Sequence, residues 1–357
     1  MKKYIFFIMV LISTALEAQD KKFYYNGDFR IRGEGNYGGT LHPWYREVVR
    51  FRLRTRYQVN PMFSVNTGLG TGSKGDPNTN DVTLGNFNDK LELNLFTANV
   101  GFNYKAITIQ GGKFEMPFNQ TDMVWDSDIY PQGVSFRYGS LNSNVIIPFV
   151  SALFFVIDDQ TVLKDSYMSG LQAGFDFKIN KKSLSLSMAY YDYTIGSFKN
   201  TDPLTNVTGG DIRTNFLNED STGYRNKFKL ADAILRMNFN AGNLPAGFIL
   251  NFVYNTGASS DNKGFSADVF VGKTSKVKDF KLLYGLSMTE TDAVLAAFSN
   301  DNTQQPTNYF QHTVAIDYVI LDNTTLDFTY YLYRKLNSFD EPNPYLSRLR
   351  LNLALKF

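Results

Sequence analysis

The chain has 357 residues, with no cysteine, only two histidines and, after residue 20, no apolar run of 18 residues. Without cysteine, neither disulfides nor lipoprotein processing can occur. Without a long apolar run, that part of the chain cannot form a transmembrane helix. The histidines, His42 and His312, lie near no serine-and-acid pattern, and no zinc, calcium or phosphate-loop motif is present, so we expect neither an enzyme nor a bound metal or cofactor. A net charge of +2 gives no indication of nucleic-acid binding.

The first 18 residues have the composition of a secretory signal peptide. Lys2 and Lys3 form a positive start and Tyr4–Ile12 an apolar core. An uncleaved anchor helix is the alternative, but this core is too short to span a bilayer. We expect cleavage after Ala18, which leaves residues 19–357 as one domain of an exported protein.

Basic and apolar side chains alternate along the segment Arg46–Val59. Every second residue in its centre is an arginine: Arg50, Arg52, Arg54 and Arg56. A period of two places the arginines on one face of a strand and the apolar residues on the other. Four like charges on an open soluble face would repel each other. The pattern suits a transmembrane barrel strand, with its apolar face toward lipid and its polar face toward a wet lumen.

Alternating segments bounded by Gly, Asn and Asp continue through the chain and predict about 16 strands, within a range of 14–18. The expected strands are Tyr24–Glu34, Arg46–Val59, Phe63–Gly72, Lys90–Asn103, Ala106–Phe114, Gly133–Tyr138, Asn144–Ile157, Met168–Ile179, Ser183–Ile195, Tyr224–Asn240, Ala246–Gly257, Gly264–Lys273, Phe280–Thr289, Tyr309–Ile320, Thr324–Lys335 and Tyr345–Phe357. Short and long connections alternate, as in outer-membrane barrels with short periplasmic turns and long outer loops. The sequence therefore predicts an all-β, antiparallel transmembrane barrel in the outer membrane.

The last predicted strand ends at Phe357 and alternates leucine with basic and polar residues. Such an edge would aggregate if it were exposed, so we expect it to close the barrel by pairing with the first strand. Three neighbouring strands would then share a basic inner wall. Its arginines would be Arg30, Arg32, Arg50, Arg52, Arg54, Arg56, Arg348 and Arg350. A wall of guanidiniums at a constriction is expected to select anions.

An acidic loop, Glu115–Gln132, is the expected partner of this wall. Its carboxylates are Glu115, Asp122, Asp126 and Asp128. Folded against the arginines, they would create a transverse field across the pore. In the alternative interpretation the arginines only brace the loop, and little selectivity remains.

Several short motifs resemble the family of bacterial putative porins, relatives of the phosphate-selective porins O and P. They are the signal peptide, the first strand Gly27–Arg32, the stretch Trp125–Asp128 followed by Pro131–Gly133, and the terminal Phe357. Gln132 stands where the family often has an acidic residue. The resemblance implies a sixteen-stranded porin, commonly trimeric, with its third loop inside the pore. It also implies that the terminal phenylalanine is an assembly signal for the barrel-assembly machinery.

The expected function is a water-filled channel for passive diffusion of small hydrophilic solutes, favouring anions. A non-conducting structural or adhesion barrel is the alternative. Aromatic residues near strand ends, such as Tyr25 and Tyr57, are expected to form girdles at the membrane interfaces. Tyr331 and Tyr333, which can point inward, are the candidates for stacking a sugar. The expected partners are the lipid bilayer, the assembly machinery, small anionic or polar solutes and further copies of the chain.

Overall fold

A computed structural model describes residues 22–38, 43–72, 80–85, 91–139, 145–159, 165–180, 182–196, 214–220, 222–300, 302–338 and 343–357. The expected signal peptide, residues 1–18, and His42 lie outside the described residues. Among the helices in the described part, none combines the length and apolarity needed to cross a membrane.

The regular secondary structure of the described residues is β-strand, apart from short 3-10 segments such as η2 (Ala296–Phe298). The strands are β1 (Phe23–Gly38), β2 (Trp44–Gln58), β3 (Phe63–Thr71), β4 (Val82–Thr83), β5 (Leu93–Tyr104), β6 (Ile107–Lys113), β7 (Gln132–Gly139), β8 (Ile146–Asp158), β9 (Ser166–Ile179), β10 (Lys182–Thr194), β11 (Phe228–Ala241), β12 (Leu244–Asn255), β13 (Lys263–Gly272), β14 (Phe280–Thr289), β15 (Tyr309–Leu321), β16 (Thr324–Lys335) and β17 (Leu346–Lys356). Every strand predicted from the sequence is present.

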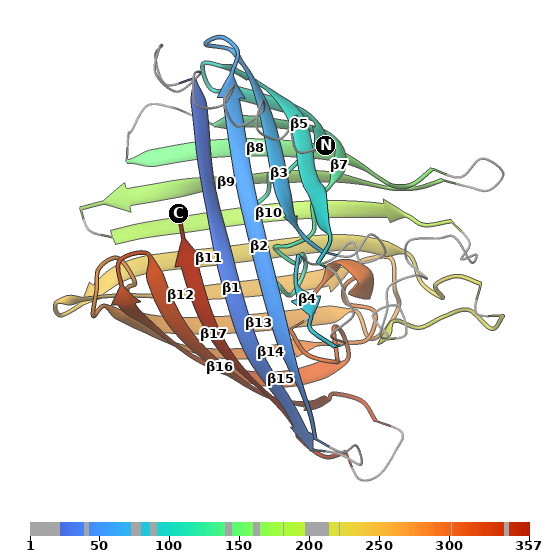
Figure 1. Ribbon diagram of the computed structural model, residues 1–357. Coiled ribbons are helices and arrows are strands. Elements are labelled where there is room, and N and C mark those ends of the chain that lie inside the picture. Colours follow the sequence, from blue (N-terminus) through green and yellow to red (C-terminus); the bar gives the residue numbers. More distant parts are fainter. Residues whose placement is uncertain are drawn as a thin grey trace.

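Sixteen of these strands form one closed antiparallel barrel (Figure 1). Each pairs with the next along the chain, and β17 pairs back onto β1 over the register Asp28↔Lys356 to Gly38↔Leu346. The remaining strand, β4, is a two-residue segment that pairs with β2 beyond the end of β3. The predicted barrel and its closure by the last strand are therefore confirmed.

The two faces of the wall have opposite chemistry because side chains alternate along each strand. On β17, Leu351 points outward and is 48% exposed, whereas the neighbouring Arg350 points inward and is 5% exposed. Tyr25 and Tyr57, two of the expected girdle residues, are also exposed. An apolar outer face and a polar inner face are what a strand needs between lipid and an aqueous lumen.

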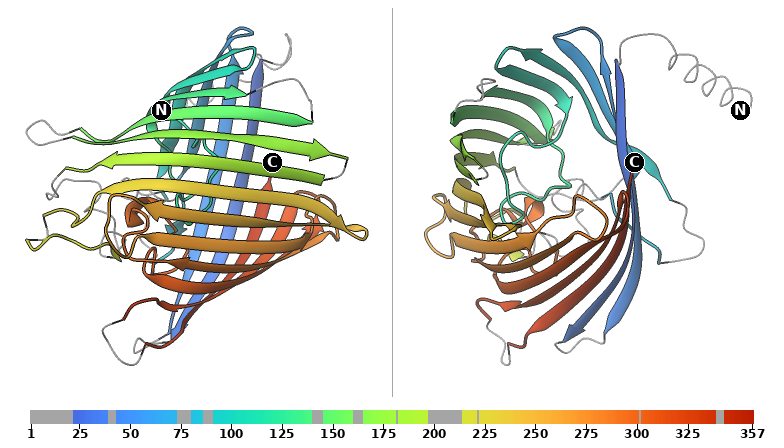
Figure 2. Two further views of the ribbon diagram at one scale, coloured as in Figure 1. Left: turned by 180° about the vertical axis from the view of Figure 1, so that it is seen from behind. Right: turned by 90° about the vertical axis from the view of Figure 1, so that its left-hand side faces the viewer.

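The two ends of the barrel differ in their connections. One end carries short links, such as residues 59–62, 105–106, 180–181 and 322–323, and is called the short-turn end below. The other end carries the long loops, among them residues 114–131 and 290–308. Both of these loops fold back into the ring of strands, as the end-on view in Figure 2 shows.

The two inward loops share an apolar core with one side of the barrel. Trp125 of the first loop stacks on Phe298 of η2, with ring centroids 5.3 Å apart. The backbone N–H of Asp126 also donates to the carbonyl oxygen of Phe298 at 2.8 Å. Around them lie inward residues of β8 to β12, including Phe155, Tyr193 and Leu230. This core occupies the side of the lumen formed by β8 to β12 and leaves the other side to polar residues.

Candidate functional site

The polar side of the lumen is formed by β17, β1 and β2, three neighbouring strands with inward arginines. The register places Arg30 opposite Arg50, and two carboxylates stand opposite arginines on the next strand: Asp28 opposite Arg52 and Glu34 opposite Arg350. All eight arginines predicted from the sequence point into this wall. Arg46, at the start of the same alternation on β2, is a ninth member that was not predicted. We call these nine the arginine wall.

Asp28 joins the arginines of β2. Its carboxylate accepts hydrogen bonds from Nε of Arg50 at 3.1 Å and from Nε of Arg52 at 2.9 Å. Arg54 approaches the same carboxylate at 3.6 Å. One carboxylate on β1 is thus shared by three guanidiniums on β2. This sharing keeps three like charges in register on adjacent inward positions.

Glu34 has the same role toward the long-loop end of the wall. Its side chain has no solvent exposure and lies 2.8 Å from both Arg46 and Arg350. Arg348 is 3.5 Å away and Arg32 is 3.9 Å away. Burying a carboxylate is tolerated only when charged partners compensate the lost hydration. Four guanidiniums supply that compensation here.

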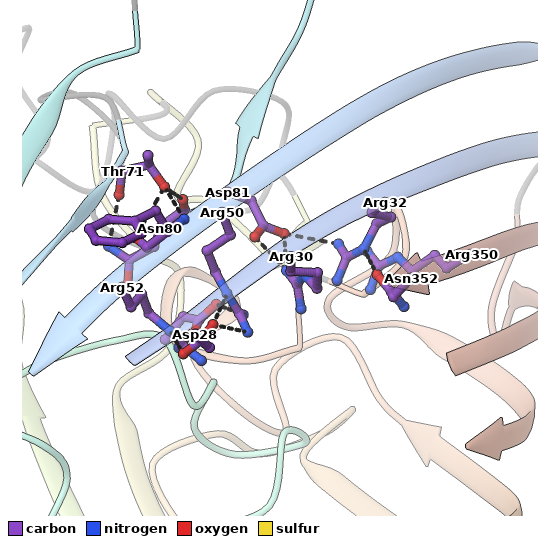
Figure 3. A network of polar contacts seen from close by, with 12 residues as sticks. Asp28, Arg30, Arg32, Arg50, Arg52, Thr71, Asn80, Asp81, Arg350 and Asn352 are labelled. Carbon is purple, nitrogen blue, oxygen red and sulfur yellow. Dashed lines mark hydrogen bonds and ion pairs between the residues drawn. The ribbon is translucent and has the colours of Figure 1, made fainter. Parts of the chain in front are cut away.

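Asp81 enters the wall from the loop after β3 and was missed from the sequence. It forms ion pairs with Arg30 and, at 2.9 Å, with Arg32 (Figure 3). The neighbouring Asn80 holds this part of the loop against β3 through two hydrogen bonds with Thr71. Nδ2 of Asn80 donates to the Thr71 carbonyl oxygen at 3.0 Å, and the Thr71 hydroxyl donates to the Asn80 carbonyl oxygen at 2.7 Å. Burial alone would raise the pKa of Asp81, but Arg30, Arg32 and Arg50 together hold it below its ordinary value of 3.8.

Two of the four predicted loop acids meet the wall. Asp128 accepts a hydrogen bond from Arg52 at 2.9 Å and lies 3.8 Å from Arg50. Glu115 accepts from Nε of Arg54 at 2.8 Å, although its side chain is 63% exposed. The loop after β6 is thereby held across the lumen by ion pairs on one side and by its apolar core on the other.

The other two predicted acids have different contacts. Asp122 accepts from Nδ2 of Asn302 at 3.2 Å. Asp126 is buried and accepts from the backbone N–H of Asp128 at 2.9 Å, which shapes the turn that presents Asp128. Sequence alone could not separate these roles, because all four acids lie within one irregular loop.

The second inward loop was also not anticipated from the sequence. Its Asn302 accepts from Nη1 of Arg348 at 2.9 Å through the carbonyl oxygen, and from Nη1 of Arg350 at 2.6 Å through Oδ1. The signal that could have revealed this loop is Ala293–Phe298, an entirely apolar stretch within a polar connection. Such a stretch must be buried against something.

The arginine wall carries more positive charge than its partners neutralise. In the described part of the chain, eight of its nine guanidiniums form ion pairs with five carboxylates: Asp28, Glu34, Asp81, Glu115 and Asp128. Four positive charges therefore remain in excess over these carboxylates. Arg56 forms no ion pair with any described residue, and it donates to Oε1 of Gln58 at 2.8 Å.

Tyr331 and Tyr333 point inward, as the sequence suggested, but both are covered. They are 9% and 1% exposed, and the guanidinium of Arg350 lies 5.4 Å from the Tyr331 ring. They therefore cannot offer an open ring to a sugar in this structure. The described residues also contain no group of three or more side chains suited to holding a metal ion.

Comparison with known proteins agrees with this architecture. The sequence model of the family described as "putative porin" matches residues 40–222, just over half of the chain. No curated protein matches the sequence.

Three solved structures have a similar fold. An anion-selective porin from Comamonas acidovorans has 11% identity and a TM-score of 0.55, over 94% of this chain and 99% of the other. OprB of Pseudomonas putida, in its high-pH structure, has 10% identity and a TM-score of 0.65 over 97% of both chains. OmpT of Vibrio cholerae, in a trimer form, has 9% identity and a TM-score of 0.52, over 94% of this chain and 99% of the other.

Proposed function

The chain belongs to the putative porin family, and we propose from this that it forms a water-filled outer-membrane channel that favours small anions. Family and fold imply an outer-membrane, non-enzymatic channel protein. The anion preference rests on one observation, the four excess positive charges of the arginine wall. A closer relation to the phosphate-selective porins O and P is part of the same proposal.

The arrangement of charges explains why this excess acts on solutes. The wall lines one side of the lumen, and the apolar core of the two inward loops fills the opposite side. We propose that a solute crossing the barrel passes on the arginine side, between the contacts that join the loops to the wall. Charges next to low-dielectric walls focus the local field and concentrate counter-ions.

A second property of the wall is that its arginines share their carboxylate partners. Each of Asp28, Glu34 and Asp128 is shared between two or more arginines, so the guanidiniums in these groups outnumber the carboxylates that they share. Guanidiniums also remain charged at any physiological pH and offer several donors. Anions can thus bind briefly to the less buried arginines, Arg46, Arg54 and Arg56, and leave again, as conduction requires.

The decisive measurement is the reversal potential of single channels in a potassium chloride gradient, made with the refolded chain from residue 19. We expect chloride to be preferred over potassium. The double substitution Arg52→Ser and Arg54→Ser should lower this preference, because it reduces the excess positive charge of the arginine wall from four to two. Potassium preference in the native chain would refute the anion proposal, and a barrel that never conducts would favour the structural or adhesion alternative.

Arg334→Ser is the matched control for these variants. Arg334 lies on the outer face of β16, with its guanidinium 5.9 Å from the Phe310 ring and 5.2 Å from the Tyr345 ring. The substitution removes one positive charge of the same kind from the barrel without touching the lumen. Its reversal potential should equal that of the native chain.

Other parts of the proposal concern processing and partners. We propose that residues 1–18 are removed on export and that residues 19–357 form the barrel domain. The assembly machinery would recognise the last strand with its terminal Phe357. A homotrimer in the lipid bilayer is proposed from the trimeric form of the similarly folded OmpT.

A further inference from the structure

A polar cavity of about 510 Å³ lies at the short-turn end of the lumen, beside the arginine wall. Its lining comes from five neighbouring strands and the first residues of the inward loop. The side chains that matter below are Asn26 of β1, Arg54 and Arg56 of β2, Asn66 of β3, Gln110 of β6 and Glu115. This volume lies within the range typical of small-molecule sites.

The charge within the cavity is uneven. Arg54 is engaged by Glu115 at 2.8 Å and by Asp28 at 3.6 Å. Arg56, one position of the same face further along β2, forms no ion pair with a described residue and is exposed. A guanidinium presents a planar fork of donors that matches a carboxylate in two parallel hydrogen bonds. Arg56, whose Nη2 donates to Oε1 of Gln58, is thus the arginine of the cavity that has no carboxylate partner among the described residues.

The amides around Arg56 are oriented by hydrogen bonds to one another and to the surrounding strands. Nδ2 of Asn66 donates to Oδ1 of Asn99 at 2.9 Å, and Nδ2 of Asn99 donates to the Lys113 carbonyl at 3.1 Å. Oε1 of Gln110 accepts from the Ser135 hydroxyl at 3.4 Å. These contacts leave Oδ1 of Asn66 as an acceptor and Nε2 of Gln110 as a donor. Hydroxyl groups, which both donate and accept, suit such a mixed set.

Glu115 limits the charge that the site can hold. It lines the cavity and remains largely exposed while paired with Arg54. A second negative charge on a ligand would be repelled by this carboxylate, whereas a single charge can lie on Arg56 away from it. The cavity therefore favours a monoanion over a dianion such as a phosphate monoester.

We propose that this cavity binds a small polyhydroxylated monocarboxylate, of the size of a sugar acid, at the short-turn mouth of the channel. The carboxylate would lie on the fork of Arg56, and the hydroxyls would meet Asn66, Gln110 and Asn26. The inference rests on the proposed channel function, because the solute reaches the cavity through the lumen.

Gluconate, acetate, glucose and glucose 6-phosphate are the probes that separate the parts of this proposal. Each would be titrated against the refolded chain in a bilayer, with interruption of the single-channel current as the readout. We expect gluconate to block at lower concentrations than the other three. Acetate has the charge without the hydroxyls, glucose has the hydroxyls without the charge, and the phosphate carries a second charge.

Two variants locate the binding, and one serves as a control. Arg56→Gln should weaken the gluconate block roughly tenfold, the scale of a lost hydrogen bond to a charged group. Gln110→Leu should weaken the gluconate block and leave acetate unchanged. Arg334→Gln, on the outer face, should change neither.

Three results would overturn the site: equal block by gluconate and acetate, equal block by gluconate and glucose, or a gluconate block unaffected by Arg56→Gln. These results are independent of the small-ion experiment. A channel that prefers chloride but shows no gluconate block leaves the proposed function intact and refutes only the site. A channel that binds gluconate through Arg56 without preferring chloride refutes the anion selectivity and retains the site.

Discussion

Trp125 and Phe298, from loops that are far apart in the sequence, stack inside the barrel with their ring planes inclined by 11°. Phe155 of β8 meets both rings edge-on, at centroid distances of 5.9 and 5.7 Å. The stack joins the two inward loops to each other and to the wall. It therefore holds both loops inside the barrel, opposite the arginine wall.

The first prediction concerns this stack. Phe298→Ala should raise the single-channel conductance, because the second loop loses its main apolar contact and no longer stays packed in the lumen. The free energy of unfolding of the refolded barrel should also fall, by the ~3–5 kcal/mol typical of a buried Phe→Ala change. Unchanged conductance would show that these loops do not restrict the pore.

A double-mutant cycle with Trp125→Ala tests whether the two rings act together. Aromatic pairs typically couple by about 0.5–1.5 kcal/mol beyond their separate burial. We expect a coupling of this size in the free energy of unfolding. Additive effects would mean that each loop is held by the wall alone.

The second prediction separates the acids of the first inward loop. Asp128→Asn leaves Arg50 and Arg52 with only Asp28 and should strengthen the preference for chloride, with a change of roughly fivefold at most for one charge in water. Asp122→Asn is the matched control, because it removes the same charge from the same loop while its carboxylate accepts from Asn302 of the second loop. Reversal potentials measure both. A larger shift with Asp122 than with Asp128 would contradict the geometry.

The third prediction concerns Asp81. Asp81→Asn removes the charge that Arg30 and Arg32 share and should cost about 1.5–3 kcal/mol, the scale of hydrogen bonds to charged groups. Amide hydrogen exchange in residues 80–85 should rise, since this segment is fastened through Asp81 and the neighbouring Asn80. Protection that equals that of the native chain would show that the Asn80–Thr71 bonds hold the segment alone.

The pH dependence of the same segment follows from the lowered pKa of Asp81. A carboxyl whose pKa is lower in the folded protein stabilises the fold above its ordinary value, and this stabilisation is lost as the pH falls through the folded value. Protection of residues 80–85 should therefore be constant from neutral pH to about 4 and decline only below 3.8. A decline centred near pH 6 would exclude Asp81 as its cause.

The fourth prediction concerns the closure of the barrel. Gly27 and Phe357 exchange two backbone hydrogen bonds, of 2.8 and 3.1 Å, and the Phe357 ring covers the glycine. A Cβ on residue 27 would clash with that ring and would lie 2.6 Å from the Arg52 carbonyl oxygen. Gly27→Ala should therefore reduce the yield of folded barrel, with a cost of about 1–3 kcal/mol typical of overpacking.

Gly33→Ala provides the control, since a Cβ on that residue of the same strand meets nothing within 4 Å. Heat-modifiable migration on gels would report the folded fraction of each variant. Equal yields of folded barrel for the two alanine variants would show that the packing of the Phe357 ring on Gly27 does not contribute to barrel closure.

Much of the fold follows from local pattern. The alternation in Arg50–Arg56 predicted a strand with one charged face, and β2 (Trp44–Gln58) places those arginines inward. The same reasoning located the other fifteen long strands, because a residue between lipid and lumen must match the face on which it lies. Strand boundaries were predicted less accurately: β1 continues to Gly38, four residues beyond its expected end, since Asn36 still pairs across to Arg348.

The candidate site was only half predictable. Eight arginines of the wall were predicted from their alternation along the strands and from closure of the barrel. Arg46 could have been predicted in the same way, because it lies in the same alternation on β2. Asp81 was not, because its position depends on how the loop after β3 returns to pair as β4 with β2. The roles of Asp122 and Asp128 differ for the same reason. Both lie in irregular backbone, where side-chain direction has no period.

The sequence by itself determined that this is a barrel, which of its side chains face inward, and that a basic wall forms at the seam of β17, β1 and β2. These features depend on a period of two and on the bilayer, which act on every strand alike. Only the tertiary structure decided which acids neutralise the wall, that a second loop enters the lumen, and that Arg56 lies beside a polar cavity without an ion pair to any described residue. Those outcomes depend on contacts between distant loops, which no local pattern encodes.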